Sequence, residues 1–439
     1  MHMLILFLEL SFFSLVVYFL QRKKPVELFS PVYIFLFYYV FIFSFGWLLS
    51  PLDFSAGGVS ADIILTEYDY RITFLYGMSV VIFFTMGALF QTYLSRYRWV
   101  KKDRNERFRT IFFTAYRSET KEKYPKTILA LIFLLGVIVF VFILIGVGPS
   151  NIWLRDVYLP VEVRGAKIIG FALTPFVVML LGYSFLRVKH LYRSLILIMM
   201  AMYFVLYFAL ASRWFAFMLV LFMLGVLMCR PSSKKIKLLV VFSAIFAFLL
   251  LLVPLSLRAL EAHGLYPYFL AVIGDSVIID WGQLEKMTNN LLFSYSLTGH
   301  IIMYENIDIK HLMISINPLP GSLVGWYESV DVLRVNPYTP FNAPGELLNH
   351  GVLYAAVFYF MLGVYFSSLD NKINQYLTKN KLLLSALLVG LAVLYTISSL
   401  QYNLRSGLRL IYYIIAFQLV VFMLCNSKKY FFVKINKRT

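Results

Sequence analysis

A glutamate and a histidine four residues apart are the first candidates for chemistry in this sequence. Glu346 and His350 lie where a proline-rich polar stretch meets a strongly apolar one, and Asn349 stands beside the histidine. If this junction is helical, the two side chains share one face, one turn apart. Such a pair can serve as a general base and the group that orients it, with Glu346 ahead of His350. The simpler alternative is a carboxylate at a helix start, where the helix dipole favours it, beside an interfacial histidine.

Arginines at the ends of apolar stretches are the second set of candidates. They are Arg213, Arg258, Arg405 and Arg409. Guanidinium groups bind phosphates through paired hydrogen bonds and keep their charge when partly desolvated, so the four together indicate an anion clamp. For any single arginine, snorkelling to water or pairing with a nearby acid explains the position equally well. Arg155 and Arg164 flank Asp156 and Glu162, and local pairing is the better explanation for both.

The elements that must position these groups are membrane-spanning helices. Hydrophobic residues make up 61% of the 439 residues and charged residues only 14%, which excludes a soluble globular domain of this length. The apolar residues come in runs long enough to cross the hydrocarbon core of a bilayer as helices. Because a backbone in lipid must satisfy its hydrogen bonds internally, we expect an all-α, polytopic transmembrane protein.

Hydropathy predicts eleven spans, with ten to twelve as the range that their boundaries allow. They cover residues 3–20, 31–49, 72–94, 127–147, 166–186, 194–211, 214–229, 238–256, 351–367, 383–399 and 408–425. The first run lacks a preceding basic residue and a small-residue cleavage site, so we expect a retained helix, not a signal peptide.

The placement of positive charge predicts the topology. Lys and Arg collect in loops 21–30, 95–126, 187–193, 230–237 and 368–382 and in the tail 426–439, which are therefore expected in the cytoplasm. The C-terminus is then cytoplasmic, and the odd number of spans places the N-terminus outside. The net charge of +18 thus indicates topology and contact with anionic membrane lipids, and we expect no nucleic-acid partner.

One long segment, residues 257–350, is neither apolar nor short, and it falls on the outer side. Its tryptophans and the prolines of its second half predict a folded loop with short helices. Loops of this length in a compact protein are usually functional. We expect one integral membrane domain over residues 1–439 with this loop as its outer cap. Within the loop, His300 and Arg334 join Asn349 as candidates for binding a substrate.

No sequence motif points to a metal or a cofactor. His263, His300 and His311 lack a metal-ligand spacing, and HExxH, CxxC, Walker A, GxGxxG and GxSxG patterns are absent. The two cysteines, Cys229 and Cys425, each stand at the inner end of a predicted span, so no disulfide framework is expected. We therefore expect no cofactor and assign no residue to a metal site.

Three stretches give the C-terminal half and the overall topology a resemblance to a known family. They are ASRWFAFMLVLFMLGVLM (Ala211–Met228), GELLNHGVLYAAVFYFMLG (Gly345–Gly363) and NLRSGLRLIYYIIAF (Asn403–Phe417). Together with the long outer loop, they resemble the Wzy-type oligosaccharide repeat-unit polymerases of O-antigen and related bacterial surface polysaccharides. That family has both termini in the cytoplasm, and the count of eleven spans departs from this.

The resemblance implies a metal-independent, membrane-embedded glycosyltransferase of the bacterial inner membrane with a periplasmic active face. Such enzymes transfer a growing glycan from undecaprenyl diphosphate to the next lipid-linked repeat unit. The four arginines would then bind the diphosphate leaving group, and Glu346 or His350 would take the proton of the acceptor hydroxyl. A chain-length regulator protein is a further possible partner.

Other functions stay open at this point. An O-antigen ligase shares the lipid carrier, the face and the large loop, but it transfers the glycan to lipid A core. A flippase or other transporter of lipid-linked oligosaccharides would carry charged residues within its spans and have short loops on both sides, and this sequence shows the reverse. A structural membrane protein would leave the outward arginines and the Glu346–His350 junction unexplained.

Overall fold

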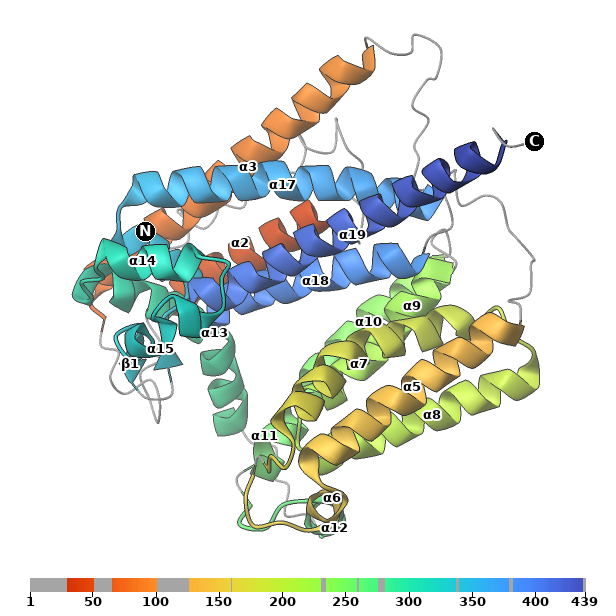
Figure 1. Cartoon of the computed structure of the whole chain (residues 1–439). Helices are drawn as coiled ribbons and strands as arrows, with labels where there is room; N and C mark the ends of the chain where they lie inside the picture. The colour runs from red at the N-terminus through yellow and green to blue at the C-terminus, as the bar shows by residue number, and fades with distance from the viewer. Residues whose placement is uncertain are drawn as a thin grey trace. The chain divides into compact units, whose positions relative to one another are not determined.

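The computed structural model of the chain is almost entirely helical (Figure 1). It describes residues 30–50, 65–100, 126–158, 160–229, 234–258, 260–274, 281–336, 339–378 and 382–436. Within these residues, seven helices are long and apolar enough to cross a membrane, and two shorter apolar helices cover Trp214–Leu227 and Leu387–Gln401. The predicted all-α polytopic class is confirmed. The predicted span 3–20 lies outside the described residues, and each of the other predicted spans falls on described helices.

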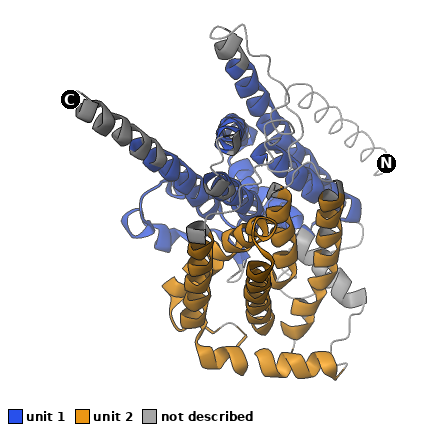
Figure 2. Cartoon of the chain, turned by 90° about the vertical axis from the view of Figure 1, so that its right-hand side faces the viewer, with its two compact units in different colours: residues 1–109, 289–439 blue, residues 110–288 orange. Residues whose placement is uncertain are grey.

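The chain divides into two compact units, coloured separately in Figure 2. Unit 1 combines residues 1–109 with 289–439, and unit 2 consists of residues 110–288. The segment 257–350, expected as one outer loop, is therefore shared between the two units. Its first part, to residue 288, belongs to unit 2, and the rest belongs to unit 1.

Unit 2 is a bundle of antiparallel helices. Its elements are α5 (Lys126–Val147), α6 (Pro149–Trp153), α7 (Arg164–Phe185), α8 (His190–Ala209), α9 (Trp214–Cys229), α10 (Lys234–Leu250), α11 (Leu252–Arg258) and α12 (Leu265–Ile273). Helix α7 packs between α5 and α9, around a buried core that includes Val178, Tyr207 and Met218. The connections 148–163, 210–213 and 251–274 meet at one end of this bundle, which we call the loop end of unit 2.

Unit 1 is built on long helices with an aromatic core. They are α2 (Pro31–Leu49), α3 (Glu67–Val100), α17 (Val352–Thr378), α18 (Leu382–Gln401) and α19 (Leu404–Asn436), and α13 (Trp281–Tyr304) joins them from residue 289 onward. The Phe35 ring lies between those of Tyr39 and Phe84, with both centroid distances 4.0 Å. Burial of such rings is a large apolar contribution to helix association.

Short elements close one end of unit 1, and we call residues 305–349 its cap. They are α14 (Ile309–Ile316), the 3-10 helix η3 (Gly321–Leu323), α15 (Trp326–Ser329), the strands β1 (Arg334–Asn336) and β2 (Thr339–Pro340), and α16 (Ala343–Asn349). The two strands pair antiparallel, with Arg334 opposite Pro340. Leu297 and Ile301 of α13 pack with Trp326, Leu333 and Phe341 to form the buried centre of the cap. Short helices were predicted for this segment, and they are present.

Two glycines allow α3 and α17 to approach closely. A Cβ atom on Gly87 would meet the carbonyl oxygen of Phe360, and a Cβ on Gly363 would meet that of Phe84. Small residues at such positions let helix backbones touch, which is the usual way to gain contact between helices in a membrane.

We therefore predict that Gly363→Ala destabilises unit 1, whereas Gly407→Ala in α19 does not. Overpacking at Gly363 should cost about 1–3 kcal/mol, while a Cβ on Gly407 meets no atom closer than 3.5 Å. Alanine is the better helix former by about 1 kcal/mol, so the control should be neutral or slightly stabilising. Thermal unfolding of the purified chain in detergent measures both, and equal midpoints would show that the helix contact is looser than described.

Candidate functional site

Glu346 is buried at the contact between α16 and α19. Its side chain is only 1% exposed, and its Oε1 accepts a hydrogen bond of 2.9 Å from the backbone N–H of Leu404, the first residue of α19. Burial raises the pKa of Glu346 to about 8, and the hydrogen bond from Leu404 only partly opposes this rise. The carboxyl group is therefore mostly protonated at neutral pH.

Asn342 fixes the start of the helix that presents Glu346. Its Oδ1 accepts a hydrogen bond of 3.0 Å from the N–H of Gly345, which caps α16. Its Nδ2 donates to the carbonyl of Ser294 at 3.0 Å and to Oγ1 of Thr298 at 2.8 Å, both on α13. Sequence reasoning missed this residue, although an asparagine followed two positions later by proline is a helix-start signal.

Within the described residues, no hydrogen bond or ion pair joins Glu346 to His350, so the predicted pair of a base and its orienting group has no support from these contacts. Helix α16 ends at Asn349, His350 is its C-cap, and Gly351 has a φ of 108° before α17 begins at Val352. His350 is half-buried, and burial lowers the pKa of its imidazole, so the ring is neutral near pH 7. Its Nε2 is buried without a hydrogen-bond partner among the described residues. Each group can accept a proton, but neither orients the other.

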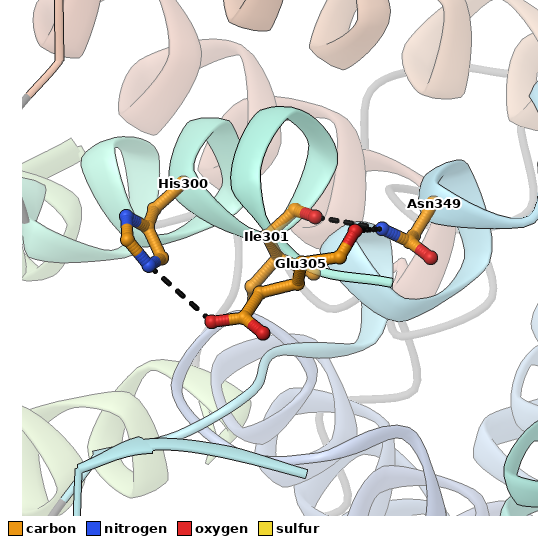
Figure 3. A network of polar contacts seen from close by, with 4 residues as sticks. All are labelled: His300, Ile301, Glu305 and Asn349. Carbon is orange, nitrogen blue, oxygen red and sulfur yellow. Dashed lines mark hydrogen bonds and ion pairs between the residues drawn. The ribbon is translucent and has the colours of Figure 1, made fainter. Parts of the chain in front are cut away.

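Asn349 braces the end of α13, as Figure 3 shows. Its Nδ2 donates to the carbonyls of Ile301 at 2.7 Å and Glu305 at 2.8 Å, and its Oδ1 accepts from the N–H of Ile307 at 3.2 Å. Both amide protons are thus used by the backbone. The predicted roles in binding a substrate or orienting the base have no geometric support from this arrangement.

The other two predicted substrate-binding residues lie on different elements of unit 1. His300 on α13 is half-buried, with Nε2 3.4 Å from Oε1 of Glu305 (Figure 3). Arg334 on β1 lies 4.0 Å from the carboxylate of Asp331, at the limit of an ion pair. The structure therefore brings His300 and Asn349 to the same residue, Glu305, whereas the Arg334 guanidinium lies beside Asp331.

Arg405 is buried against the cap of unit 1. It is 2% exposed, its Nη1 donates to the carbonyls of Ile314 and Asn317, and its Nη2 donates to that of Leu319. Its guanidinium carbon lies 5.2 Å from the ring centre of Trp326. Arg409 follows on α19, is exposed, and forms no hydrogen bond or ion pair within the described part of the chain. Of these two predicted clamp residues, only Arg409 is free to meet a ligand.

Arg213 and Arg258 meet at the loop end of unit 2. Arg213 is exposed in the turn between α8 and α9, two residues after Ala211, whose φ is 43°. Arg258 ends α11, its Nε donates to the carbonyl of Ala211 at 3.0 Å, and its guanidinium lies 5.0 Å from the ring centre of Tyr158. The predicted clamp thus falls into two pairs on different units, and in unit 2 the pair shares one turn.

Arg155 belongs to the same place, and its predicted pairing with Asp156 or Glu162 is wrong. Nη1 donates to the carbonyls of Asn151 at 2.8 Å and Ala209 at 3.0 Å, and Nε donates to that of Tyr158 at 3.3 Å. Neighbours in an irregular loop direct their side chains apart, so sequence adjacency to an acid did not produce an ion pair. We call Arg155, Arg213 and Arg258 the unit 2 arginine cluster.

The unit 2 arginine cluster contains no compensating carboxylate. Within the described residues, none of its three guanidinium groups forms an ion pair, and both ion pairs found lie in unit 1. Burial raises the pKa of the Tyr158 phenol, and the three arginines act against that rise. Three cations around one phenol favour the binding of an anion.

Comparison of the chain with protein-family models, with curated proteins and with solved structures gave no match in any of the three. The described residues also hold no group of three or more His, Cys, Asp or Glu side chains that could bind a metal ion. The resemblance to Wzy-type polymerases therefore remains a prediction from the sequence.

We predict that Asn349→Asp destabilises the cap of unit 1 by about 1–3 kcal/mol. The substitution replaces two donors by carboxylate oxygens that face the carbonyls of Ile301 and Glu305. Asn371→Asp is the matched control, because the Nδ2 of Asn371 makes only a long contact of 3.5 Å with Ser95. Thermal unfolding of both variants tests this, and an unchanged midpoint for Asn349→Asp would remove the proposed brace.

We also predict that Glu346 makes the free energy of unfolding depend on pH. Because its pKa is raised to about 8 in the folded protein, folding favours the protonated form. This stability is fully present below the unfolded pKa, near 4.5, and is lost as pH rises through about 8. One pKa unit corresponds to about 1.4 kcal/mol, so the total loss is on the order of a few kcal/mol.

The measurement compares unfolding midpoints of wild type and Glu346→Gln between pH 5.5 and 8.5. The glutamine keeps an acceptor for the Leu404 N–H and does not ionise, so the difference between the two proteins isolates Glu346. We expect the variant to gain relative stability as pH rises. A difference that does not change with pH would contradict the raised pKa.

Proposed function

We propose that this protein is a membrane glycosyltransferase that polymerises oligosaccharide repeat units linked to undecaprenyl diphosphate. It would do so for O-antigen or a similar surface polysaccharide, at the periplasmic face of a bacterial inner membrane. The reaction breaks the bond between the anomeric carbon of one glycan and its lipid diphosphate. It forms a bond from that carbon to a hydroxyl oxygen of the next lipid-linked unit.

The observation that carries this proposal is the carboxylate-free pairing of Arg213 and Arg258 at the loop end of unit 2. A lipid diphosphate leaves with its charge on terminal phosphate oxygens, and guanidinium groups stabilise that charge as it develops. The two arginines share the 210–213 turn, and Arg258 is anchored there by the carbonyl of Ala211. Arg213 stays exposed and able to meet a ligand. The opposite end of the same bundle carries Arg187, Lys189 and Arg193, as expected for a cytoplasmic end.

The proposed reaction also needs a base to receive the proton of the acceptor hydroxyl, and the candidates are the predicted residues Glu346 and His350. With a pKa of about 8, Glu346 is ionised in about one tenth of molecules at pH 7, and its conjugate acid matches the working pH of a general base. His350 is the second candidate, because its imidazole is less buried and neutral. Arg409 on α19 stays an exposed candidate for binding a phosphate, and Arg405 would position the cap through its three carbonyl bonds. A chain-length regulator is the protein partner that fits this activity.

The test deletes the gene in its host and examines the surface polysaccharide on a gel. We expect molecules with a single repeat unit, and restoration of the polymer ladder by the wild-type gene. Arg213→Ala, Glu346→Gln and His350→Gln are compared at equal expression with Arg164→Ala, an exposed arginine at the start of α7. Arg164→Ala should restore the ladder and Arg213→Ala should not. Of Glu346→Gln and His350→Gln, the variant that does not restore the ladder identifies the base.

Two outcomes would reject the proposal. If the deletion leaves no glycan attached to lipid A core, the protein is a ligase. If the ladder is unchanged, polymerisation is not its function. Full-length polymer from Arg213→Ala would remove that arginine from the leaving-group site.

A further inference from the structure

Arg155 is a buried cation with one unused hydrogen-bonding group. Its side chain is 5% exposed, and Nε and Nη1 are occupied by carbonyls, but Nη2 is buried without a partner among the described residues. A buried donor left unpaired costs free energy, and buried polar groups in folded proteins nearly always have a partner. Nη2 therefore marks a place where an acceptor is missing.

Both cations and acids lie near Arg155: Asp156 lines the same hollow, and Glu162 accepts a hydrogen bond from Asn151, but neither acid forms an ion pair with Arg155 in the described part of the chain. The cations near it are Lys167, which is bound to the Pro160 carbonyl, and Arg258, which shares the 209–211 turn with it. The Tyr268 ring centre lies 5.9 Å from its guanidinium carbon. His263 donates or accepts at Nδ1 with the Tyr268 hydroxyl at 2.9 Å, and burial together with Arg155 lowers its pKa, so it stays neutral.

A hollow lies directly beside this buried cation. It has a volume of about 500 Å³ and is lined by Asn151, Leu154, Arg155, Asp156, Val157, Pro160 and Val161. Asp156 is exposed and makes no ion pair with Arg155. The volume is sufficient for a diphosphate or for one sugar ring bearing a carboxylate.

The carbonyl bonds fix the position of the Arg155 guanidinium group before any ligand binds. Ala209 is the last residue of α8, and a helix C-terminus favours a nearby cation. The carbonyls hold the guanidinium plane in place, so binding loses little side-chain entropy. The carbonyl groups leave the guanidinium with its full positive charge, and a bound oxyanion would neutralise that charge.

We propose that Arg155 is a third anion-binding residue of unit 2, whose free Nη2 receives an oxygen of a phosphate or carboxylate group seated in this hollow. The inference rests on the proposed function only for the identity of the ligand, which would be part of the glycan donor or acceptor. The binding of a simple oxyanion tests it without any polymerisation.

The experiment measures thermal unfolding of the purified full chain in neutral detergent against sodium pyrophosphate, with sodium chloride at equal ionic strength as reference. A ligand that binds only the folded protein raises its midpoint saturably. Arg155→Lys keeps the charge but loses the guanidinium fork, so we expect the half-saturating concentration to rise at least tenfold. Arg193→Lys, an arginine at the opposite end of the same unit, should leave it unchanged.

Sodium glucuronate in place of pyrophosphate separates two sources of the oxyanion. Tighter binding of pyrophosphate assigns the site to the diphosphate leaving group, and tighter binding of glucuronate assigns it to an acidic sugar. A midpoint that neither anion moves beyond the chloride reference would overturn the proposal. So would an Arg155→Lys protein with the half-saturating concentration of the wild type.

The wild-type chain provides a second measurement if Arg155→Lys does not fold. Hydrogen exchange of the amides in 151–158 and 209–213 should slow on addition of pyrophosphate, and exchange at 187–193 should not. Unchanged exchange at the first two segments would also overturn the proposal. The two proposals can fail independently. Absence of anion binding at Arg155 does not change the result expected for the polymer ladder, and an unchanged ladder does not change the anion binding expected at Arg155.

Discussion

Buried guanidinium groups bound to backbone carbonyls organise one end of each unit. Arg405 binds the carbonyls of three cap residues in unit 1, and Arg155 binds three carbonyls at the loop end of unit 2. The last carbonyls of a helix lack intrahelical partners, and a guanidinium with five N–H donors can satisfy several at once. One side chain thereby joins segments that are far apart in sequence. Replacing it would leave several buried acceptors unpaired, so the irregular segments around it depend on this one interaction.

The same interaction has different electrostatic consequences in the two units. Carbonyl dipoles stabilise a cation without neutralising it, so the surroundings decide what the remaining charge does. In unit 1 the Trp326 ring lies against the Arg405 guanidinium, which suits a closed structural contact. In unit 2, by contrast, Arg258 and Arg213 lie at the same turn as Arg155, and no carboxylate is paired with any of them. Arginines that looked equivalent in sequence therefore differ: Arg213 and Arg258 of unit 2 are better suited to an anionic ligand than Arg405 is.

The helices were predictable from the sequence because lipid imposes a local rule. Each span must satisfy its own backbone and present apolar side chains, so hydropathy alone located the described spans. The site was less predictable because its contacts are not local: Glu346 meets Leu404 across 58 residues, and Arg155 meets Ala209 across 54. Spacing was also misleading at the junction, because the Glu346 carboxyl group accepts from the N–H of Leu404, and no hydrogen bond or ion pair joins it to His350 within the described residues. The adjacency of Arg155 and Asp156 in sequence was misleading too, because the side chains of neighbouring loop residues need not face each other.

Burial of Glu346 links catalytic potential to stability. Desolvation raises its pKa to about 8, which is the property that a general base at neutral pH needs and also the reason that ionisation weakens the fold. The Leu404 N–H offsets part of this cost, because it donates to the carboxylate at the positive end of the α19 dipole. Proton uptake and release at Glu346 must therefore change how firmly α16 is held against α19. A base in this position would be coupled to the packing of the cap, whereas the less buried His350 would exchange protons without such a coupling. This difference in coupling, rather than their spacing in sequence, is the physical distinction between the two candidates.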